Sequence, residues 1–415
     1  MAADLDSLDI ISNDTYARNG YPHEAWTLLR REDPIHWNDR NIVNPFWAVT
    51  KHADIVWISK QPELFRNGPR LAALPEMAPP EGSGAVVLRH LLNMDPPDHG
   101  AFRKLASHRF TPRGLERMRR DIEVIARDLL DAMMGDGGAQ QDDFVERLSG
   151  PLPLQVLAEL LGVPRDMWPT MFDWTNRVIG SADPEYQEAG DDAFRTAQKA
   201  RLSLFGYFAE MARERRAKPT DDIVSVVANA RIDGEPLPER ELLSFYFLLV
   251  VAGNETTRNA MTGGLLAFLE HPGEWDRLRR DPSLVDSAVE EIVRWTTPVI
   301  QFCRTPIEDV EIRGVKIRAG QNLCLFYPSA NRDEEVFDDP FHFRIDRHPN
   351  RHLAFGIGEH FCLGANLARL ELRVVFRHLA ARLAECELAG PVERLRSSFV
   401  GGIKRMPIRY RIGEG

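Results

Sequence analysis

Hydrophobic positions recur with helical spacing along most of the chain from Pro96 to about Glu270. Apolar side chains at every third or fourth position are typical of helices that bury one face against a core. Glycine and proline interrupt the pattern at Gly135 to Gly138, Gly162 to Pro164, Lys218-Pro219 and Asp233-Gly234. The interruptions predict several consecutive helices rather than one long one.

Similar spacing predicts helices elsewhere in the chain. A short one is expected from His52 to Ser59, a helical block from about Pro272 to Trp295, and a terminal helix from Leu363 to about Glu385. The longest helical pattern begins after Pro238, which suits a first-turn position, and ends before His271-Pro272. Thirty-odd residues in a helix span roughly 50 Å, enough to cross the molecule.

Strand-like patterns are confined to short stretches. Phe46 to Thr50 predicts one strand, and residues 298 to 327 predict β-like runs with turns at Arg313-Gly314 and Ala319-Gly320. Ser397 to Arg411 predicts a closing hairpin after the terminal helix.

No repeat and no shift in composition marks a linker. We therefore expect a single domain over residues 1–415, mainly α with a minor β portion, preceded by a flexible lead-in over residues 1–20. Residues 67 to 91 are rich in proline, glycine and alanine. A loop of that length is expected to be a lid or binding loop, with a disordered surface insertion as the alternative.

The middle of the longest helical pattern contains residues that suit a buried helix poorly. Leu242 to Ala252 is apolar nearly all round, which predicts burial, and Ala252-Gly253-Asn254-Glu255-Thr256-Thr257 follows directly. Gly253 alone costs about 1 kcal/mol relative to alanine. Glycine with threonine can open the helix and admit water or a small ligand, and a buried acid beside a hydroxyl suits proton delivery. The alternative is a kink solvated by one structural water, with Glu255 in a salt bridge.

Composition narrows the class of protein. The chain has 415 residues, 43% of them hydrophobic and 27% charged, with a net charge of −10. A sizeable core is available, and the negative charge argues against a general nucleic-acid binder. The basic runs Arg117 to Arg120 and Arg213 to Arg216 are expected to be solvated helix faces, with docking of an acidic partner as the alternative.

Cysteine usage and the N-terminus favour a cytoplasmic protein without a membrane anchor. The chain has four cysteines and no C-x-x-C pair, which fits a reducing compartment. The N-terminus lacks an apolar signal core, and the longest apolar run is too short to span a bilayer.

One stretch near the C-terminus combines a cysteine with three glycines and a histidine, from Phe355 to Gly364. Cys362 is expected where a loop becomes a helix, and unpaired N–H groups with the helix dipole favour a thiolate there. Gly364 would let a flat ligand approach the first turn. The alternative is a buried structural cysteine behind a glycine turn.

Four potential hydrogen-bond donors could accompany that cysteine. His99 and Arg103 are four residues apart on one predicted helix face, Arg304 is in a β-like run, and His360 is two residues before Cys362. Each is a surface cation if the fold keeps them apart. Brought together, they could bind two carboxylates.

These stretches together closely resemble the cytochrome P-450 family of haem-thiolate monooxygenases. Phe355 to Gly364 matches the pattern F-G-x-G-x-H-x-C-x-G, and Ala252 to Thr256 matches A-G-x-[DE]-T. Glu291 and Arg294 match E-x-x-R, and Phe343 to Arg347 resembles the later arginine segment. The likeness covers essentially the whole chain. It departs at Glu255, where many relatives have aspartate, and at Thr305-Pro306, where the strand is expected to end early.

The resemblance implies a P-450 fold with heme b between the long central helix and the helix of the cysteine loop. Cys362 would be the proximal thiolate ligand of the iron, whose electron donation favours O–O cleavage. Phe355 would shield the sulfur. Glu291, Arg294 and Arg347 would form a structural triad. The remaining cofactor-binding residues would be His99, Arg103, Arg304, His360, Gly356, Gly364 and Ala252, with His352 as a weaker candidate.

The implied activity is insertion of one oxygen atom of O2 into an apolar organic substrate. Thr256 and Glu255 would stabilise bound dioxygen species and feed protons. Electrons would come from a ferredoxin and its reductase, because the chain shows no reductase domain. The expected substrate-lining residues are Leu92, Phe247, Leu248, Val251, Val299, Ile300, Phe399 and Val400.

The sequence says least about which substrate is oxidised. Gly253 to Ala260 resembles bacterial relatives that oxidise sterols and branched or long-chain lipids. Hydroxylation of a terpenoid or small aromatic is the alternative. A peroxide-driven peroxygenase and a non-enzymatic haem-thiolate sensor are further alternatives, and Glu255 with Thr256 counts against the first.

Overall fold

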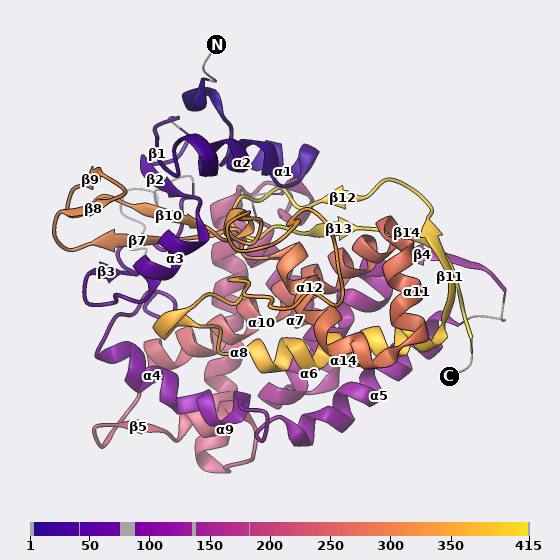
Figure 1. Cartoon of the computed structure of the whole chain (residues 1–415). Coiled ribbons are helices and arrows are strands. Elements are labelled where there is room, and N and C mark those ends of the chain that lie inside the picture. The colour runs from indigo at the N-terminus through magenta and orange to yellow at the C-terminus, as the bar shows by residue number, and fades with distance from the viewer. Residues whose placement is uncertain (1–3, 41, 75–87, 135–137, 182, 414–415) are drawn as a thin grey trace.

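The computed structural model describes residues 4–40, 42–74, 88–134, 138–181 and 183–413 (Figure 1). Helices dominate it, and the strands are short, as the sequence predicted. The helices are α1 (Asn13–Asn19), α2 (His23–Glu32), α3 (His52–Ser59), α4 (Asp98–Ser107), α5 (Glu116–Met133), α6 (Pro151–Leu161), α7 (Trp168–Ile179), α8 (Ala193–Ala217), α9 (Ile223–Ala228), α10 (Glu239–Glu270), α11 (Pro272–Arg280), α12 (Val285–Thr296), α13 (Tyr327–Ala330) and α14 (Ala365–Arg382).

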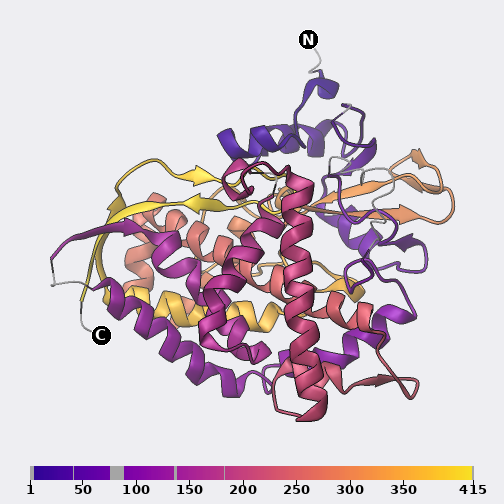
Figure 2. The same ribbon diagram turned by 180° about the vertical axis from the view of Figure 1, so that it is seen from behind.

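Most of the strands gather at two sides of the helical part, as Figures 1 and 2 show. They are β1 (Ile35–Asn38), β2 (Phe46–Val49), β3 (Phe65–Arg66), β4 (Gln140–Asp143), β5 (Arg231–Ile232), β6 (Glu235–Pro236), β7 (Gln301–Pro306), β8 (Val310–Ile312), β9 (Val315–Ile317), β10 (Leu323–Phe326), β11 (Leu383–Leu388), β12 (Glu393–Arg394), β13 (Ile403–Arg405) and β14 (Pro407–Ile412). The largest sheet has the order β1-β2-β10-β7-β3 and lies on the left in Figure 1. The sheet β11-β14-β4 lies at the opposite edge.

Helix α10 is the centre of the helical part. It follows Pro238, which is the N-cap rather than a first-turn residue. Helices α6, α8, α12 and α14 pack against it, and most of its side chains are buried. Every residue from Glu239 to Glu270 is helical, so the helix continues through Gly253.

Helices end where the sequence predicted a break if a glycine or proline at that position determines the turn. Helix α3 covers the predicted residues, α6 ends at Gly162 in the left-handed region, and α8 ends before Lys218-Pro219. Glycine adopts that backbone conformation without the strain that a β-carbon causes. The block expected from Pro272 is divided into α11 and α12 by a turn at Pro282–Leu284.

Three expectations about chain ends and strands are wrong. Residues 4–20 are not a flexible lead-in, because Ile10, Ile11 and Tyr16 are buried beneath the largest sheet. The C-terminal stretch is not one hairpin, because β13 pairs with β12 whereas β14 pairs with β11 and β4. Strand β7 does not end early, because Pro306 at its edge still pairs with Phe65 of β3.

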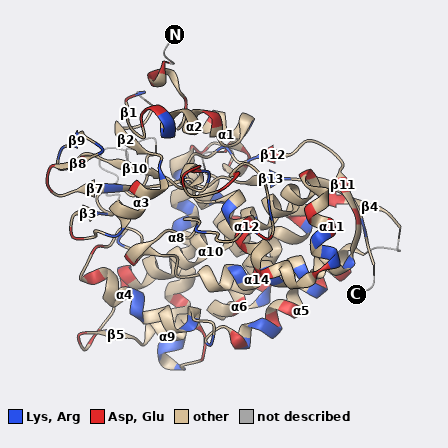
Figure 3. Cartoon of the chain, in the orientation of Figure 1, with Lys and Arg blue, Asp and Glu red and all other residues tan. Residues whose placement is uncertain are grey.

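Charged residues are mixed over the described surface. Figure 3 shows acidic and basic segments interspersed along the helices. No described helix combines the length and the apolarity that crossing a membrane would require. The predicted lid over residues 67–91 falls mostly on residues 75–87, which lie outside the described part.

Candidate active site

An apolar cavity lies between the middle of α10 and the start of α14. The predicted residues that line it are His99, Arg103, Ala252, Thr256, Arg304, Phe355, Gly356, His360, Cys362 and Gly364. They come from α4, α10, β7 and the loop before α14. Segments far apart in the sequence thus meet at one place, as the cysteine-and-cation hypothesis required.

The loop before α14 depends on glycine at two positions. Gly356 and Gly358 have φ angles of 68° and 78°, in the left-handed region that side chains rarely adopt. A β-carbon at Gly358 would lie 2.3 Å from the carbonyl oxygen of Ser59. The loop then returns on itself, and the Cys362 N–H donates to the Phe355 carbonyl oxygen at 2.8 Å.

The Cys362 thiol is not acidic in the protein alone, contrary to the expectation from its place before a helix. Burial raises its pKa, and this effect exceeds the opposing ones of the Gly364 and Ala365 amides and of Arg103 and Arg369. A buried thiolate therefore needs a further positive charge, which an iron ion would supply.

The four predicted donors form one cluster. The His99 and His360 rings lie 4.0 Å apart between centroids, and Asn67 Nδ2 is 2.6 Å from His360 Nε2. Burial, together with Arg304, His99 and Arg103, lowers the pKa of His360 to about 2. Burial and Arg103 also lower the pKa of His99. Both imidazoles are thus neutral at pH 7, and the positive charge of the cluster comes from its two arginines.

The guanidinium groups of the cluster bond to backbone oxygens. Arg103 donates to the Phe361 carbonyl at 2.7 Å, and Arg304 donates to the Cys303 carbonyl at 2.8 Å. Within the described part of the chain, no ion pair joins either arginine to a carboxylate, and the buried Nε2 of His99 has no partner. Two charged donors and an unpaired nitrogen fit a group that carries two carboxylates.

The cysteine side of the loop is held by an ion-pair cluster. The Arg369 guanidinium lies 4.4 Å from the centre of the Phe355 ring and donates to Glu290 at 2.6 and 2.8 Å. His352 Nε2 is 3.1 Å from the same carboxylate and does not line the cavity. His352 is therefore not a member of the donor cluster.

Helix α10 presents a hydroxyl to the cavity but turns its acid away. Thr256 Oγ1 donates to the Ala252 carbonyl at 2.9 Å, within an unbroken helix. Glu255 does not line the cavity; it is 1% exposed and forms an ion pair with Arg258. The salt bridge considered as the alternative for Glu255 is thus present.

A second ionic cluster stabilises the region beneath the cysteine loop. Arg294 donates to both Glu291 oxygens at 2.7 Å, and Arg347 Nε lies 3.1 Å from the same carboxylate. All three side chains are buried. Arg294 also donates to the carbonyls of Asn331 and Pro340, so the cluster ties α12 to the long segment that precedes the cysteine loop.

The predicted substrate-lining residues divide into two groups. Leu92, Leu248 and Val299 line the cavity, whereas Phe247, Val251, Ile300, Phe399 and Val400 do not. Phe247 and Val251 lie one position before Leu248 and Ala252, which rotates them about 100° round the helix. Ile300 follows Val299 on an extended segment and therefore faces the opposite side, against the N-terminal segment. Phe399 packs on Phe302, and Val400 pairs with Val299.

Sequence reasoning missed several lining residues. Leu249 and Ala260 follow the α10 face already set by Leu248 and Thr256, so helical spacing could have found them. Phe302 and Tyr327 require the β7–β10 pairing, which no local pattern states. Glu371 of α14 also lines the cavity, and its burial raises the pKa of that carboxyl well above the ordinary value.

An apolar cavity that joins one cysteine thiol to donors suited to two carboxylates is the geometry of a site for an iron porphyrin. Comparison with known proteins agrees. A family model described as Cytochrome P450 matches residues 154–384. The chain belongs to the cytochrome P450 family, and it is a monooxygenase whose cofactor is heme b.

Named relatives extend over almost the whole chain. It is 40% identical to the steroid C26-monooxygenase of Mycolicibacterium smegmatis, over 98% of this chain and 94% of that protein. It is 39% identical to the methyl-branched lipid omega-hydroxylase of Mycobacterium tuberculosis, over 98% and 94%. It is 36% identical to the linalool 8-monooxygenase of Pseudomonas putida, over 96% and 98%.

A solved structure supports the fold. The cytochrome P450 of Mycobacterium marinum in complex with pseudoionone matches with a TM-score of 0.89 at 36% identity, covering 97% of this chain and 98% of that one.

Proposed function

We propose that this P450 hydroxylates a sterol or a branched or long-chain lipid. The observation that carries the proposal is an apolar cavity wall beside Thr256, built by Leu92, Leu248, Val299 and Phe302. Relatives named for steroids and for methyl-branched lipids support the same class. Such a wall binds an apolar body by the hydrophobic effect and excludes water from the reacting carbon.

Heme b supplies the binding and reductive activation of O2 in this proposal. Cys362 would be its thiolate ligand, and Phe355, Gly356, Gly364 and Ala252, which line the same cavity, would surround the ring. His99, Arg103, Arg304 and His360 hold its two propionates. These roles are supported by the unpartnered Nε2 of His99 and by Arg103 and Arg304, which form no ion pair with a carboxylate of the described residues.

Two side chains of α10 serve the chemistry. Thr256 Oγ1 lies on the cavity wall and donates its proton to the Ala252 carbonyl, so its lone pairs would accept a hydrogen bond beside the bound oxygen. Glu255 takes protons from solvent and passes them toward Thr256, since a carboxylate held by a cation can accept and release a proton. The ion pair of Glu255 with Arg258 supports an ionised acid at this position.

A ligand screen by haem spin-state shift tests the substrate class. Sterols, fatty acids, terpenes and aromatics are titrated into the ferric protein at equal concentration. We expect sterols or long-chain lipids to give the largest shift at the lowest concentration. A larger and tighter response to terpenes would favour the linalool-type alternative, to which one relative's name points.

The ligand assignment has its own test. Reduction under CO is expected to give the red-shifted Soret band of a thiolate ligand. The Cys362→Ala variant is expected to lose that band while it keeps its fold, as circular dichroism would show. An intact band in the variant would refute the role of Cys362.

We also propose a ferredoxin and its reductase as electron donors, in the cytoplasm. Four free cysteines support a reducing compartment. Four arginines near the cysteine loop could contact such a partner. Arg109 pairs with Asp221, and Arg369 pairs with Glu290. The exposed Arg113 and Arg351 are therefore the better docking candidates. Charge reversal at Arg113 and Arg351 is expected to slow ferredoxin-dependent reduction at low salt, and unchanged rates would exclude this face.

A peroxygenase remains the competing function. Its relatives usually lack the acid and threonine that this chain has at Glu255 and Thr256. Turnover with O2, the ferredoxin system and NAD(P)H is expected to exceed turnover with peroxide alone. Turnover with peroxide and none with O2 would reverse this conclusion.

A further inference from the structure

Two of the four cysteines lie directly opposite each other in the largest sheet. Cys303 of β7 and Cys324 of β10 are register partners in an antiparallel pair, in the sheet at the left of Figure 1. Both are free thiols, and both are fully buried. Among the described residues, no other cysteine faces a second one, because Cys386 is opposite Tyr410 and Cys362 is at the cavity. We call Cys303 and Cys324 the thiol pair.

The backbone hydrogen bonds show which kind of antiparallel pair this is. The Cys303 N–H donates to the Leu71 carbonyl at 2.7 Å, so it points away from β10. Three positions earlier, where the alternation places a hydrogen-bonded pair, the Tyr327 N–H donates to the Ile300 carbonyl at 3.0 Å. Cys303 and Cys324 are therefore a non-hydrogen-bonded pair, whose α-carbons approach to about 4.5 Å. A disulfide needs about 4.4–6.8 Å between α-carbons, so the strands can stay in place when it forms.

The two side chains already interact. Burial raises the pKa of the Cys324 thiol, and a hydrogen bond with Cys303 raises it further. Cys324 also donates to Gln301 Oε1 at 3.3 Å. Opposed side chains lie closer together in a non-hydrogen-bonded pair than in a hydrogen-bonded one. The Cys303 sulfur is therefore within reach of Cys324 for a covalent bond.

The thiol pair lies directly behind the cavity wall. Phe302 and Arg304 flank Cys303 in β7, and both line the cavity. Since side chains alternate along a strand, Cys303 points to the other face of the sheet, into the cluster that contains Ile10 and Trp26. A bond between the two sulfurs would tie the strand that carries part of the cavity wall to its neighbour β10.

We propose that Cys303 and Cys324 form an intrachain disulfide when hydrogen peroxide oxidises the protein, and that this bond fixes β7 to β10 behind the cavity. Hydrogen peroxide is small and uncharged, which suits entry into a closed apolar cluster. A monooxygenase also releases it whenever O2, two electrons and two protons combine without oxidising the substrate. The oxidant thus arises on the other side of the same sheet.

The reaction takes two electrons from the thiol pair. One sulfur takes up an oxygen atom of H2O2 as a sulfenic acid, and one water leaves. The second sulfur displaces the sulfenic hydroxyl, and a second water leaves. Two thiols and one H2O2 therefore give one disulfide and two H2O.

Burial makes this reaction slow and confines it to one product. A protonated thiol attacks peroxide poorly, and burial keeps the Cys324 thiol protonated at pH 7. Once Cys303 is a sulfenic acid, however, an electrophilic sulfur lies against a thiol that is already in contact. Capture by that thiol outruns a second oxidation, because another peroxide has to enter the closed cluster first. The thiol pair therefore responds to accumulated peroxide rather than to a brief pulse.

The first test counts thiols in the haem-loaded protein. The folded protein is treated with hydrogen peroxide or with the dithiol oxidant diamide just below its unfolding transition, then denatured and alkylated. We expect two of the four cysteines to resist alkylation and to react again after dithiothreitol. Peptide mapping should give one cross-linked peptide that joins Cys303 to Cys324. After diamide, the red-shifted Soret band of the reduced CO complex should persist, because Cys362 takes no part.

Two variants serve as controls for this test. Cys324→Ser keeps a donor for Gln301 and is expected to give no cross-linked peptide with either oxidant. Cys386→Ser is the matched control and is expected to form the same disulfide as the wild-type protein. If Cys324→Ser does not fold, Cys303→Ala takes its place with the same expected result. Four alkylated cysteines in the treated wild-type protein would overturn the proposal, and so would a disulfide that joins another pair or two chains.

The second test measures what the bond does to the sheet. It closes a loop of about twenty residues, and such a bond stabilises a protein by restricting its unfolded chain. The oxidised wild-type protein is expected to unfold about 5 °C above the reduced protein. Diamide should leave the unfolding temperature of Cys324→Ser unchanged. An equal or lower unfolding temperature in the oxidised wild-type protein would show that the bond strains the sheet, and would refute its role in fixing β7 to β10.

Discussion

Glu290 is held between two cations at the edge of the cysteine loop. Arg369 forms a two-pronged pair with it, and His352 approaches from the other side. Burial alone would raise the pKa of this carboxyl, but the hydrogen bonds from Arg369 and His352 lower it to about 2 from 4.5. The folded protein therefore binds this proton less readily than the unfolded chain does.

The ion pair of Glu290 stabilises the folded protein only at pH values where Glu290 is ionised. The Glu290 pair contributes fully above about pH 4.5 and loses its contribution as the pH falls toward 2. Glu290→Gln is expected to lower the free energy of unfolding by about 2 kcal/mol at pH 7, with the deficit shrinking below pH 4.5. Urea titrations at pH 7 and at a pH below 4.5 measure this difference in the free energy of unfolding. Glu387→Gln, at the exposed pair with Arg409, is the control, and equal deficits would contradict the prediction.

Glu291 has a larger effect on stability because both of its arginine partners, Arg294 and Arg347, are buried. Glu291→Gln leaves Arg294 and Arg347 without a counter-charge, and uncompensated buried charge costs about 3–5 kcal/mol. We expect an unfolding midpoint far below that of the Glu290 variant. A loss below about 1 kcal/mol would show that the backbone carbonyls around Arg294 suffice to hold it.

At the scale of elements, α10 depends on where its glycines lie. A β-carbon at Gly264 would approach Phe376 and Ile292 to 2.7 and 2.8 Å, whereas one at Gly253 would meet Leu157 at an ordinary 3.5 Å. Replacement of glycine by alanine should therefore change the stability in opposite directions at the two positions.

Gly264→Ala is expected to destabilise the protein by about 1–3 kcal/mol, because α12 and α14 pack too closely to yield. Gly253→Ala is expected to stabilise it by up to about 1 kcal/mol through helix propensity. Urea unfolding of the two variants in the same buffer compares them. Equal stabilities would mean that the helices move apart at little cost.

Elements set by local chemistry could be predicted, and those set by distant partners could not. The bounds of α3 follow from its own residues, and the cysteine loop follows from its glycines. Strand β14 pairs with β4, more than 260 residues away in the chain, and no local pattern contains that information. A salt bridge of Glu255 was the open alternative in the sequence, but its partner Arg258 was not identified, because Arg258 is held by Asn176, which lies 82 residues earlier in the chain.

At the scale of the molecule, the N-terminal segment belongs to the fold. Ile10 and Ile11 pack with Trp26 and Phe326 beneath the largest sheet, and the Tyr16 hydroxyl donates to the Ile10 carbonyl at 2.8 Å. Tyr21 donates to the Thr297 carbonyl, next to the segment that carries Val299. The segment thus supports one wall of the cavity from outside.

Ile10→Ala is expected to lower the free energy of unfolding by about 2–5 kcal/mol, because it leaves a void in a closed cluster. Leu202→Ala, at a side chain that is 60% exposed, is the control and should change little. Thermal or urea unfolding measures both. A mobile lead-in would give the two variants the same stability. The single-domain organisation stays a prediction, and one cooperative transition would support it.

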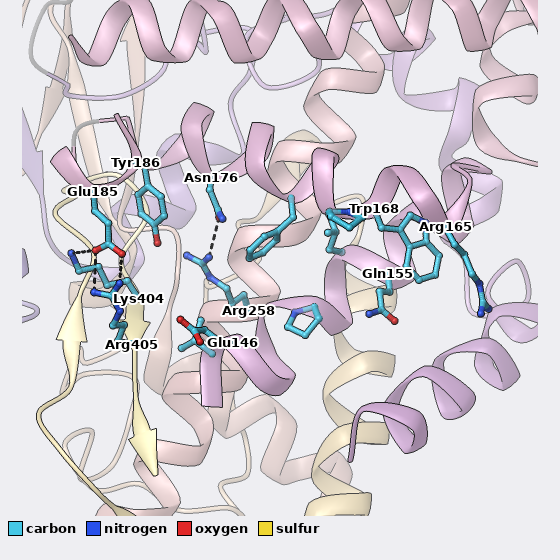
Figure 4. A pocket seen from close by; sticks show the side chains of 15 residues that line it. Glu146, Gln155, Arg165, Trp168, Asn176, Glu185, Tyr186, Arg258, Lys404 and Arg405 are labelled. Carbon is cyan, nitrogen blue, oxygen red and sulfur yellow. Dashed lines mark hydrogen bonds and ion pairs between the residues drawn. The ribbon is translucent and has the colours of Figure 1, made fainter. Parts of the chain in front are cut away.

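Helix α10 has one face on the cavity and the opposite face on a groove that Asn176, Tyr186 and Arg258 line (Figure 4). The α10 side chains that contact a substrate are therefore different from those that line the groove. Substitutions at Leu248 or Val299 can change which molecule fits while the residues toward the groove stay as they are. Directed evolution of this enzyme for new substrates should thus be able to broaden its range while the ion pair between Glu255 and Arg258 stays intact.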